Sequence, residues 1–253
     1  MTVKELYKFL DQKIPRSLSC EWDNDGLMCC PDGDREVRRV LVSLDATADI
    51  ADAAIKGGYD LILTHHPFIF KGLKSINGDS FISEKAIKLI RAGISVMSFH
   101  TRLDAVEGGV NDVLAGLVGL ENTSVFGEKG LGRIGDLREP CSLEDLAKKV
   151  KEVLGAPFVS FAGGNRVCSR VAVLGGGGAD DMYEAIAAGA DTYISGNLSF
   201  HGMTDAADIG INLIEAGHFY TENPVCRRLC ELVYEADGNT KCDILNSNRI
   251  EMI

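Results

Sequence analysis

The sequence predicts an α/β fold of two duplicated α/β repeats, with mixed or largely parallel sheets flanked by helices. The first observation concerns residues 39–64, where an apolar strand, a helix ended by two glycines and a second apolar strand follow one another. Such units place their strands parallel in one sheet. The same unit recurs 131 positions later, and histidines follow predicted strands at three separate points.

The elements of the first repeat follow from the spacing of apolar residues and from the turn residues between them. Apolar residues at helical spacing predict a helix over 3–13. Thr47 suits the N-cap of a second helix, because its side chain can accept a hydrogen bond from the first turn. The other elements expected in this repeat are strands at 39–44, 61–64 and 94–99 and helices at 48–56, at 84–91 and from near Gly109.

The second repeat is indicated by an alignment of the chain with itself that continues without gaps through strand, helix and turn. A shift of 131 positions aligns 39–42 with 170–173, Asp60 with Asp191, and 61–64 with 192–195. A register without gaps indicates an internal duplication. Further elements are expected as a helix at 203–209, a strand at 211–214 and a helix from near Pro224.

The duplication divides the chain into a first repeat at 1–125 and a second part at 126–253. The segment 120–168 lies between the two copies of the repeated unit, and glycines interrupt its predicted short strands. It also contains an expected helix at 142–154. We interpret this segment as a second lobe or an insertion.

The composition bounds the class of protein. With 45% hydrophobic and 25% charged residues the chain is typical of a soluble globular protein. No stretch has the length of a membrane span, so we expect no membrane association and a cytoplasmic location. The net charge of −11 argues against nonspecific nucleic-acid binding. The eight cysteines form no C-x-x-C pair, and in a reducing compartment we expect free thiols.

Adjacent histidines at the end of a buried strand are the first candidate site. The apolar run 61–64 leads directly into His65 and His66, and Pro67 ends the strand pairing there. In open α/β sheets, ligands bind at the carboxyl ends of strands. Adjacent residues in an extended segment point to opposite sides, so a kink is needed to aim both imidazoles at one site.

Two further strand ends carry a histidine followed by a carboxylate. His100 with Asp104 and His218 with Glu222 both have the pattern His-x-x-x-carboxylate. Imidazole and carboxylate without thiolate suit Zn²⁺, Fe²⁺, Mn²⁺, Ni²⁺ or Co²⁺. Five or six ligands exceed what one tetrahedral zinc uses, which favours two ions sharing a carboxylate. Alternatively, each acid caps the helix that follows it, but capping does not explain histidines at three strand ends.

Between about residues 20 and 230 the chain contains a set of specific motifs. They are Trp22-Asp23-Asn24-x-Gly26-Leu27, Leu44-Asp45-Ala46-Thr47, Thr64-His65-His66-Pro67, His100-Thr101-x-Leu103-Asp104, Gly108-Gly109-Val110-Asn111-Asp112, Gly132-Arg133-x-Gly135 and Ala216-Gly217-His218-x-x-Thr221-Glu222. These motifs resemble those of the Ngg-interacting-factor-three-like family, whose members are widely described as type 2 GTP cyclohydrolase I.

The resemblance implies two intertwined repeats, a toroidal homohexamer and two divalent metal ions per chain. Glu222 is then the expected bridge between the ions, and His100 is similar to a residue beside the metals. His201 aligns with Phe70 in the duplication, and we expect it to face the substrate or to support a ligand. Asn197 stands where relatives often carry Asp, a change expected to alter the rim of the site and leave metal binding intact. The metal ligands implied by the resemblance are His65, His66, Asp104, His218 and Glu222.

Three functions are compatible with these residues. The first is a metal-dependent hydrolase acting on a nucleotide-like substrate, with His100 or His201 as proton shuttle and Glu222 at the metals. The second is a phosphoesterase on nucleotides or nucleic-acid ends, and the third is a regulatory or scaffold ring without catalysis. The glycines at 175–178 lack the G-x-G-x-x-G spacing and favour a tight turn over a nucleotide loop.

Overall fold

The computed structural model describes residues 1–127, 130–164 and 166–251. Contacts within the chain define two compact units. The first unit is formed by residues 1–103 together with 225–250, and the second by residues 104–224. Each unit contains one mixed sheet with helices against it, which confirms the predicted α/β fold class.

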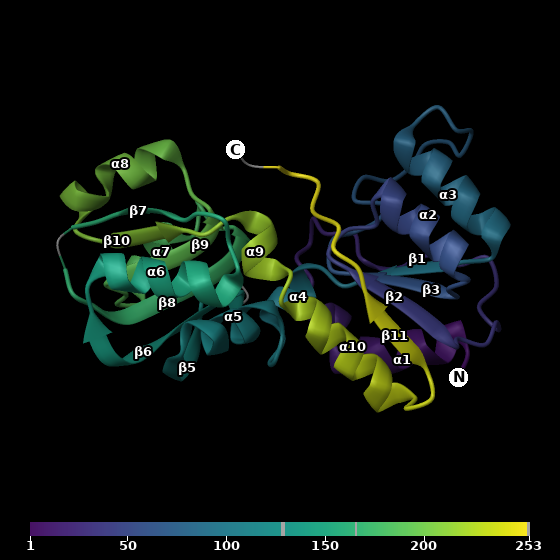
Figure 1. Ribbon diagram of the computed structural model, residues 1–253, viewed down its shortest axis with the longest axis horizontal. Helices are drawn as coiled ribbons and strands as arrows, with labels where there is room; N and C mark the ends of the chain where they lie inside the picture. The colour runs from purple at the N-terminus through teal and green to yellow at the C-terminus, as the bar shows by residue number, and fades with distance from the viewer. Residues whose placement is uncertain (128–129, 165, 252–253) are drawn as a thin grey trace. The chain divides into compact units, whose positions relative to one another are not determined.

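The first unit has a five-stranded sheet in the order β1-β4-β3-β2-β11 (Figure 1). Neighbouring strands are parallel except β1 and β4, which are antiparallel. The strands are β1 (Gly26–Cys29), β2 (Arg39–Ser43), β3 (Leu61–Thr64), β4 (Ser95–Ser98) and β11 (Lys241–Ile244). The helices are α1 (Val3–Lys13), the short 3-10 helix η1 (Arg16–Leu18), α2 (Ala48–Gly57), α3 (Phe81–Ala92) and α10 (Val225–Ala236).

Helices cover both faces of this sheet. Figure 1 shows α2 and α3 on one side of the strands and α1 and α10 on the other. Because both faces are covered, β3 is buried along its whole length, as its uninterrupted apolar run predicts. The core under α2 and α3 includes Leu41, Ile62 and Val96 from the strands and Ile50, Ala54 and Leu89 from the helices.

The second unit has a six-stranded sheet in the order β5-β6-β8-β9-β10-β7. Its three central strands, β8, β9 and β10, are parallel, and the other pairs are antiparallel. The strands are β5 (Leu120–Phe126), β6 (Gly132–Cys141), β7 (Ser160–Ala162), β8 (Cys168–Gly177), β9 (Thr192–Asn197) and β10 (Asn212–Glu215). The helices are α5 (Val110–Val118), α6 (Leu143–Leu154), α7 (Met182–Ala187), α8 (Phe200–Ile209) and α9 (His218–Glu222), and α4 (Thr101–Ala105) crosses from the first unit into the second.

The two units repeat one order of elements. The series α1, β1, β2, α2, β3, α3, β4, α4 corresponds to α6, β7, β8, α7, β9, α8, β10, α9. The strand register follows the predicted shift, because Val40 pairs with Leu61 and Val171 pairs with Thr192, each 131 positions later. Asp60 and Asp191 also correspond in their contacts, since each carboxylate accepts hydrogen bonds from two successive backbone amides at the start of the preceding parallel strand.

The repeats are intertwined through the helix that follows each of them. Helix α5 follows the first repeat in the chain but belongs to the second unit, where it contacts α6 and β8. Helix α10 follows the second repeat but belongs to the first unit, where it contacts α1 and β2. The contact of α5 with α6 thus corresponds to the contact of α10 with α1.

Two sequence predictions require correction. The segment 120–168 is an integral part of the second unit and not an insertion, because β5 and β6 extend the second sheet and α6 and β7 are the counterparts of α1 and β1. The expectation of free thiols is wrong for one pair, because Cys230 and Cys242 form a disulfide with Cα atoms 5.8 Å apart. The pairing of β11 with β2 brings Cys242 against α10, a contact that cysteine spacing did not reveal.

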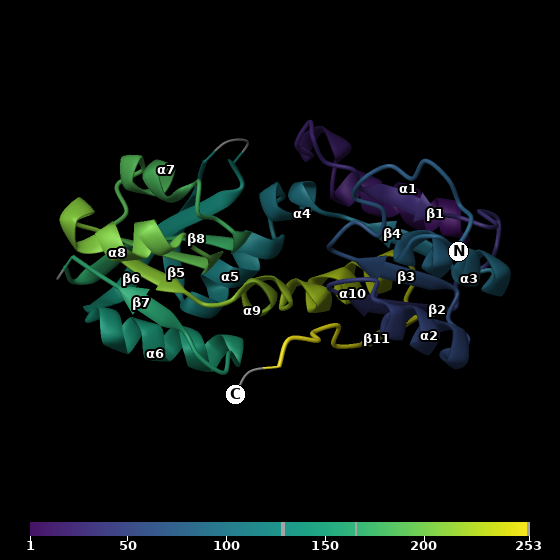
Figure 2. The ribbon, with the colours of Figure 1, turned by 90° about the horizontal axis from the view of Figure 1, so that it is seen from above.

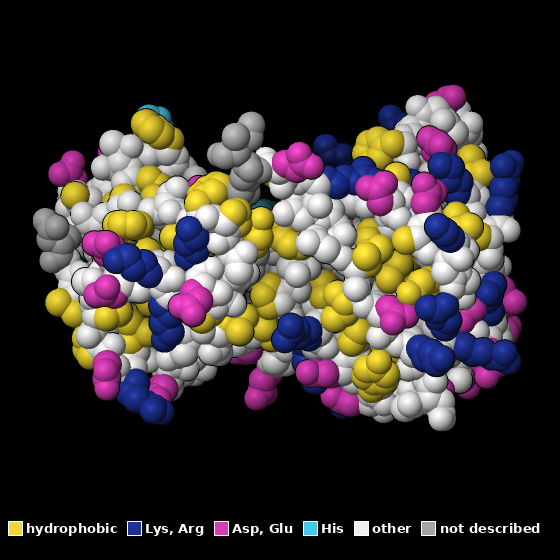
Figure 3. Space-filling view, in the orientation of Figure 1, with side chains coloured by type: hydrophobic (Ala, Val, Ile, Leu, Met, Phe, Trp, Pro, Cys, Tyr) yellow, Lys and Arg dark blue, Asp and Glu magenta, His cyan; other side chains and the backbone are white. Residues whose placement is uncertain are grey.

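The surface shows no segregation of charge on the face drawn in Figure 3, where acidic and basic side chains are interspersed. Figure 2 shows the same elements from above. Among the helices of the described residues, none combines the length and the apolar character that a membrane span requires.

Candidate metal centre

The first unit gathers three histidines at the carboxyl ends of β3 and β4. These strands are parallel neighbours with Thr64 opposite Ser98, so the residues that follow them meet at one edge of the sheet. The ring centroid of His65 lies 5.0 Å from that of His66 and 5.3 Å from that of His100. One ligand atom from each of the three histidines lies within 4.8 Å of the others. The structure therefore brings together three of the predicted site residues.

Hydroxyl groups fix the kink that turns the adjacent histidines. Thr64 Oγ1 donates to the backbone oxygen of His66 at 2.8 Å, and it lies 2.8 Å from Ser98 Oγ. The Ser98 hydroxyl in turn accepts a hydrogen bond from the amide of Phe68 at 3.2 Å. The chain is thus held in a tight turn around Pro67, and both imidazoles remain close in spite of the alternation of an extended chain.

Each of these imidazoles has its Nδ1 atom beside an oxygen acceptor. His65 Nδ1 lies 3.0 Å from the backbone oxygen of Phe99, and His65 is fully buried. His66 Nδ1 lies 2.7 Å from Asp45 Oδ1, and His100 Nδ1 lies 2.8 Å from Asp23 Oδ1. A hydrogen on Nδ1 satisfies such an acceptor and leaves the lone pair on Nε2, which is the arrangement of a metal-binding histidine.

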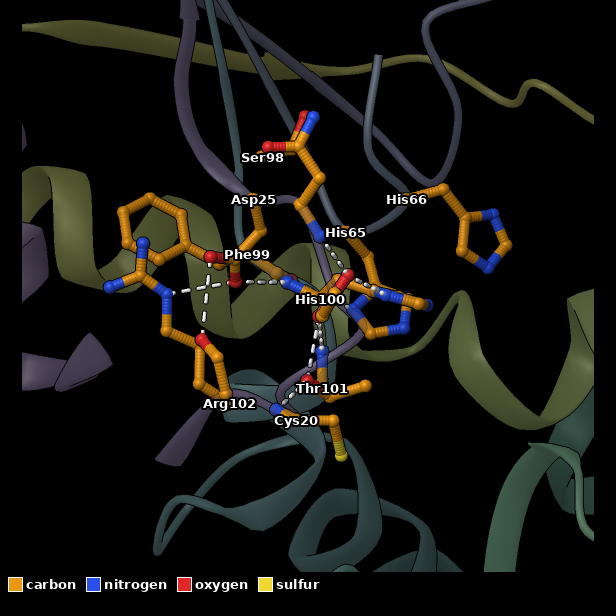
Figure 4. Close-up of polar contacts among 12 residues, drawn as sticks. Cys20, Asp25, His65, His66, Ser98, Phe99, His100, Thr101 and Arg102 are labelled. Carbon is orange, nitrogen blue, oxygen red and sulfur yellow. Dashed lines mark hydrogen bonds and ion pairs between the residues drawn. The ribbon is translucent and has the colours of Figure 1, made fainter. Parts of the chain in front are cut away.

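The loop at 20–25 positions His100 through the carboxylates of Asp23 and Asp25, of which Figure 4 labels Asp25. Besides its contact with His100, Asp23 accepts hydrogen bonds from the amide and the hydroxyl of Thr101 at 3.0 and 2.6 Å. Burial opposes the ionisation of Asp23, but the hydrogen bonds from His100 and Thr101 outweigh it and lower its pKa to about 2. Asp25 accepts from the amide of His100 at 3.1 Å and from Nε of the fully buried Arg102 at 2.9 Å.

The second unit holds Asp104, His218 and Glu222. On α9, His218 Nε2 lies 3.1 Å from Glu222 Oε2, as the spacing of four residues on one helix allows. Glu222 is buried, and one of its carboxylate oxygens lies within 4.8 Å of a carboxylate oxygen of Asp104. His218 Nδ1 lies 2.9 Å from Oδ1 of Asn197, so the residue that departs from the family pattern contacts the ring of a predicted ligand directly.

Glycines make room for Glu222. Gly176 has a φ of +69°, and a Cβ atom there would lie 2.1 Å from Glu222 Oε1. At Gly196, a Cβ atom would lie 2.8 Å from the Cα atom of His218 and 2.7 Å from Thr221 Oγ1. The glycine run at 175–178 therefore ends β8 and lets α9 approach closely, which agrees with a structural rather than a nucleotide-binding role.

The two His-x-x-x-carboxylate motifs occupy different positions in the repeat. Helices α4 and α9 correspond, and Thr101 and His218 are their first residues. His100 therefore precedes its helix, whereas His218 lies within one, and the motifs are displaced by one residue. Similarity of sequence pattern did not reveal this displacement.

The remaining site predictions have different outcomes. His201 is exposed on the first turn of α8, where its ring contacts Phe200, and its proposed role in catalysis stays a prediction. The sequence alone indicated no role for Asp23, Asp25, Asp45 or Arg102, although Asp23 and Asp45 are specified residues of the family motifs. The sequence signal that could have identified the aspartates is that they lie in predicted turns next to the ends of strands.

The duplicated sheets, with imidazole and carboxylate groups at their strand ends, define an α/β protein with candidate metal-binding groups. The family pattern of Duf34/NIF3 (NGG1p interacting factor 3) matches residues 1–251. A relative from Clostridium acetobutylicum, named GTP cyclohydrolase 1 type 2 homolog, is 36% identical over 234 residues, which cover 88% of this chain and 86% of the relative. A relative of the same name from Methanocaldococcus jannaschii is 32% identical, with 88% and 90% covered.

Solved structures agree with these relationships. A hypothetical protein from Staphylococcus aureus superposes with a TM-score of 0.90 at 29% identity, covering 100% of this chain and 99% of that protein. Reduced HcgD from Methanocaldococcus jannaschii superposes with a TM-score of 0.84 at 28% identity, covering 97% and 98%. The chain belongs to the Duf34/NIF3 family.

Proposed function

We propose that the protein is a metal-dependent hydrolase that acts on a nucleotide-like substrate. One observation carries this proposal: four histidines have Nδ1 within 3.0 Å of an oxygen acceptor and so present Nε2 as a ligand. The names of the relatives, which refer to GTP cyclohydrolase, support a nucleotide-like substrate. The proposed ligands of two divalent ions are His65, His66, Asp104, His218 and Glu222.

The donor set fits a divalent transition metal. Imidazole nitrogens and carboxylate oxygens suit Zn²⁺, Fe²⁺, Mn²⁺, Ni²⁺ or Co²⁺. Glu222 lies within 4.8 Å of ligand atoms of both His218 and Asp104, and this central position supports its proposed role as the shared carboxylate. Bound ions would supply a Lewis acid and an activated water molecule for hydrolysis.

His100 is the proposed proton-transfer residue. Its Nδ1 contact with Asp23, whose pKa is about 2, pairs the imidazole with a carboxylate that stays ionised at neutral pH. A carboxylate in this position orients the imidazole and stabilises its protonated form. The aromatic rings of Trp22 and Phe70, each 6.1 Å from the His100 ring, border the same histidine.

The test is hydrolysis by metal-loaded protein of GTP, dinucleotides and a generic phosphodiester. We expect turnover of at least one nucleotide and loss of that turnover in Glu222→Ala. Cleavage of phosphodiesters without action on the GTP base would identify a phosphoesterase instead. Stable metal binding with no turnover of any of these substrates would favour a regulatory or scaffold role and would contradict the proposal.

A further inference from the structure

A pocket in the first unit lies at the carboxyl ends of β2 and β3, and His66 is one of the residues that line it. It has a volume of about 270 Å³. The loops that follow β2 and β3 and the first turns of α3 line it, with Asp45, His66, Phe70, Phe81 and Lys85 among the lining residues. This place, at the carboxyl ends of neighbouring parallel strands, is where open α/β sheets bind ligands. The volume suits one small molecule rather than a macromolecule.

Lys85 supplies a positive charge to the pocket. Its Nζ atom donates to the backbone oxygen of Ala46 at 2.5 Å and lies 5.2 Å from the ring centroid of Phe68 and 5.6 Å from that of Phe81. Burial lowers the pKa of Lys85, and the neighbouring Asp45 opposes that effect. An ammonium group has three N–H donors, so Lys85 can bond to Ala46 and to an anionic ligand together.

Asp45, whose charge acts on Lys85, is itself held by other protein groups. The carboxylate of Asp45 contacts His66 Nδ1 at 2.7 Å and accepts from the hydroxyl of Ser247 at 3.2 Å, so both of its oxygens have protein partners. Helices α2 and α3 begin beside the pocket, and the first turn of a helix favours a negative charge.

Exposed aromatic rings form the other part of the pocket. Phe81 is 73% exposed and Phe70 is 44% exposed, although large aromatic side chains usually bury most of their surface. The ring of Trp22, itself 64% exposed, meets Phe70 edge to face at 6.1 Å. An exposed aromatic ring offers a planar ligand a surface for stacking.

We propose that this pocket binds a planar aromatic molecule carrying a phosphate or carboxylate group, with the anionic group at Lys85 and the ring against Phe70 and Phe81. The inference deepens the proposed function, because it gives the substrate of the metal-dependent hydrolase an anchoring site beside His66. Binding at Lys85 does not itself require a metal ion.

The experiment uses metal-free full-length protein, so that binding to the pocket is separated from binding to metal. Calorimetric titration is carried out with guanosine 5′-monophosphate, guanosine, benzoate and inorganic phosphate. Emission from Trp22, the one tryptophan of the chain, reports on ligands near Phe70. We expect one of the two anionic aromatic probes to bind and to change this emission. Guanosine lacks the charge that bonds to Lys85 and phosphate lacks a ring to stack on the aromatic side chains, so each should bind at least about tenfold more weakly.

Matched variants locate the binding site. Lys85→Met keeps an apolar stem without the charge and is expected to weaken binding of that probe by about tenfold or more. Phe81→Ala removes an exposed aromatic ring and is expected to weaken the binding of the same probe. Lys88→Met, on the same helix but exposed and paired with Glu84, is the control and should bind as the unchanged protein does.

The outcomes distinguish this inference from the proposed function. Equal binding by Lys85→Met, binding of guanosine as tight as that of the better anionic probe, or no binding by any probe would overturn the proposed ligand site. A preference for the nucleotide over benzoate would identify phosphate as the recognised anion, and the reverse would identify carboxylate. Metal content, measured separately by elemental analysis, tests the metal centre and should be unchanged in Lys85→Met.

Discussion

Asp45 Oδ1 lies 2.7 Å from His66 Nδ1, and the same carboxylate is held by a residue 202 positions later in the chain. The hydroxyl of Ser247 donates to Asp45 Oδ2 at 3.2 Å and accepts from the Asp45 amide at 3.2 Å. The segment after β11 therefore fixes the carboxylate that orients a proposed metal ligand. Partners of this kind set the tautomer of the imidazole and its direction.

We expect Asp45→Ala to weaken metal binding by about 10–100-fold, the usual effect of removing the partner of a ligating histidine. Titration with Zn²⁺ against a competing chelator measures this change. Asp49→Ala is the matched control, because Asp49 lies on the first turn of α2 and its exposed side chain pairs with Arg249. An equal loss in both variants would show a general effect of charge rather than orientation of His66.

Gly176→Ala tests the close approach of α9 to the end of β8. The added Cβ atom would overlap Glu222 Oε1 at 2.1 Å and would stand on a backbone with a φ of +69°. We expect a loss of about 1–3 kcal/mol in the free energy of unfolding and a reduced metal content. Gly177→Ala is the neighbouring control, since nothing lies within 4 Å of its Cβ position. Similar stability and metal content in the two variants would refute this role of Gly176.

Asp60 gives a dependence of stability on pH that does not involve the metal centre. Burial raises the pKa of Asp60, but hydrogen bonds from the amides of Arg38 and Arg39 and from the side chain of Arg35 outweigh it, so the pKa falls below its ordinary value of 3.8. The ionised carboxylate therefore stabilises the fold above that ordinary value, and this contribution is lost as the pH falls through the lowered pKa.

Asp60→Ala is expected to cost about 1–3 kcal/mol at pH 7, because two backbone amides in part-buried hydrogen bonds lose their acceptor. Chemical denaturation followed by circular dichroism at pH 7 and pH 3 measures the difference from the unchanged protein, which should shrink at the lower pH. Asp191→Ala removes the corresponding acceptor in the second repeat and should also destabilise the protein at pH 7. A cost for Asp60→Ala that is independent of pH would contradict the assignment.

The strands and the strand-end histidines could be predicted because their signals are local. The apolar run of β3 and the proline after its histidines identify a buried strand that ends at a ligand site. The duplication was visible because its register has no gaps, and Val40 and Val171 begin equivalent pairings. These features depend on residues that are close together in the sequence.

The carboxylates that orient the histidines could not be assigned because their contacts depend on tertiary structure. Asp23 meets His100 across 77 positions and Asp45 meets His66 across 21. Similarly, β11 pairs with β2 about two hundred positions away, so neither its place in the first sheet nor the Cys230–Cys242 disulfide follows from local patterns. Sequence spacing indicates which residues share a face, but not which loop lies against it.

Self-association is a further prediction, and β5 gives a physical reason for it. This strand lies at the edge of the second sheet, and most of its residues are exposed, including the large apolar side chain of Val125. Exposed edge strands readily pair with other chains. We expect an oligomer, and by family resemblance a homohexamer, in light scattering at micromolar concentration. A monomer would contradict this expectation, and Val125→Lys should weaken the assembly if β5 forms the interface.

The last prediction is that Glu222 contributes more to metal binding than any single histidine. Glu222 lies 3.1 Å from His218 Nε2 and within 4.8 Å of a ligand atom of Asp104. A carboxylate has two oxygens and can contact two ions, whereas one imidazole nitrogen contacts one. Its negative charge also offsets the charge that two divalent ions bring together. Removing this charge should therefore weaken the binding of both ions, whereas removing a histidine should weaken the binding of one.

Glu222→Gln keeps the size of the side chain and removes its charge, so we expect it to lose both ions after dialysis against a weak chelator. His66→Ala should retain more metal, as measured by elemental analysis per chain. Glu231→Gln, an exposed position on α10, controls for the change in net charge. The opposite result, in which Glu222→Gln keeps two ions and Asp104→Asn loses both, would identify Asp104 as the bridging ligand. The reason is that both ions should be released when the carboxylate that they share is removed.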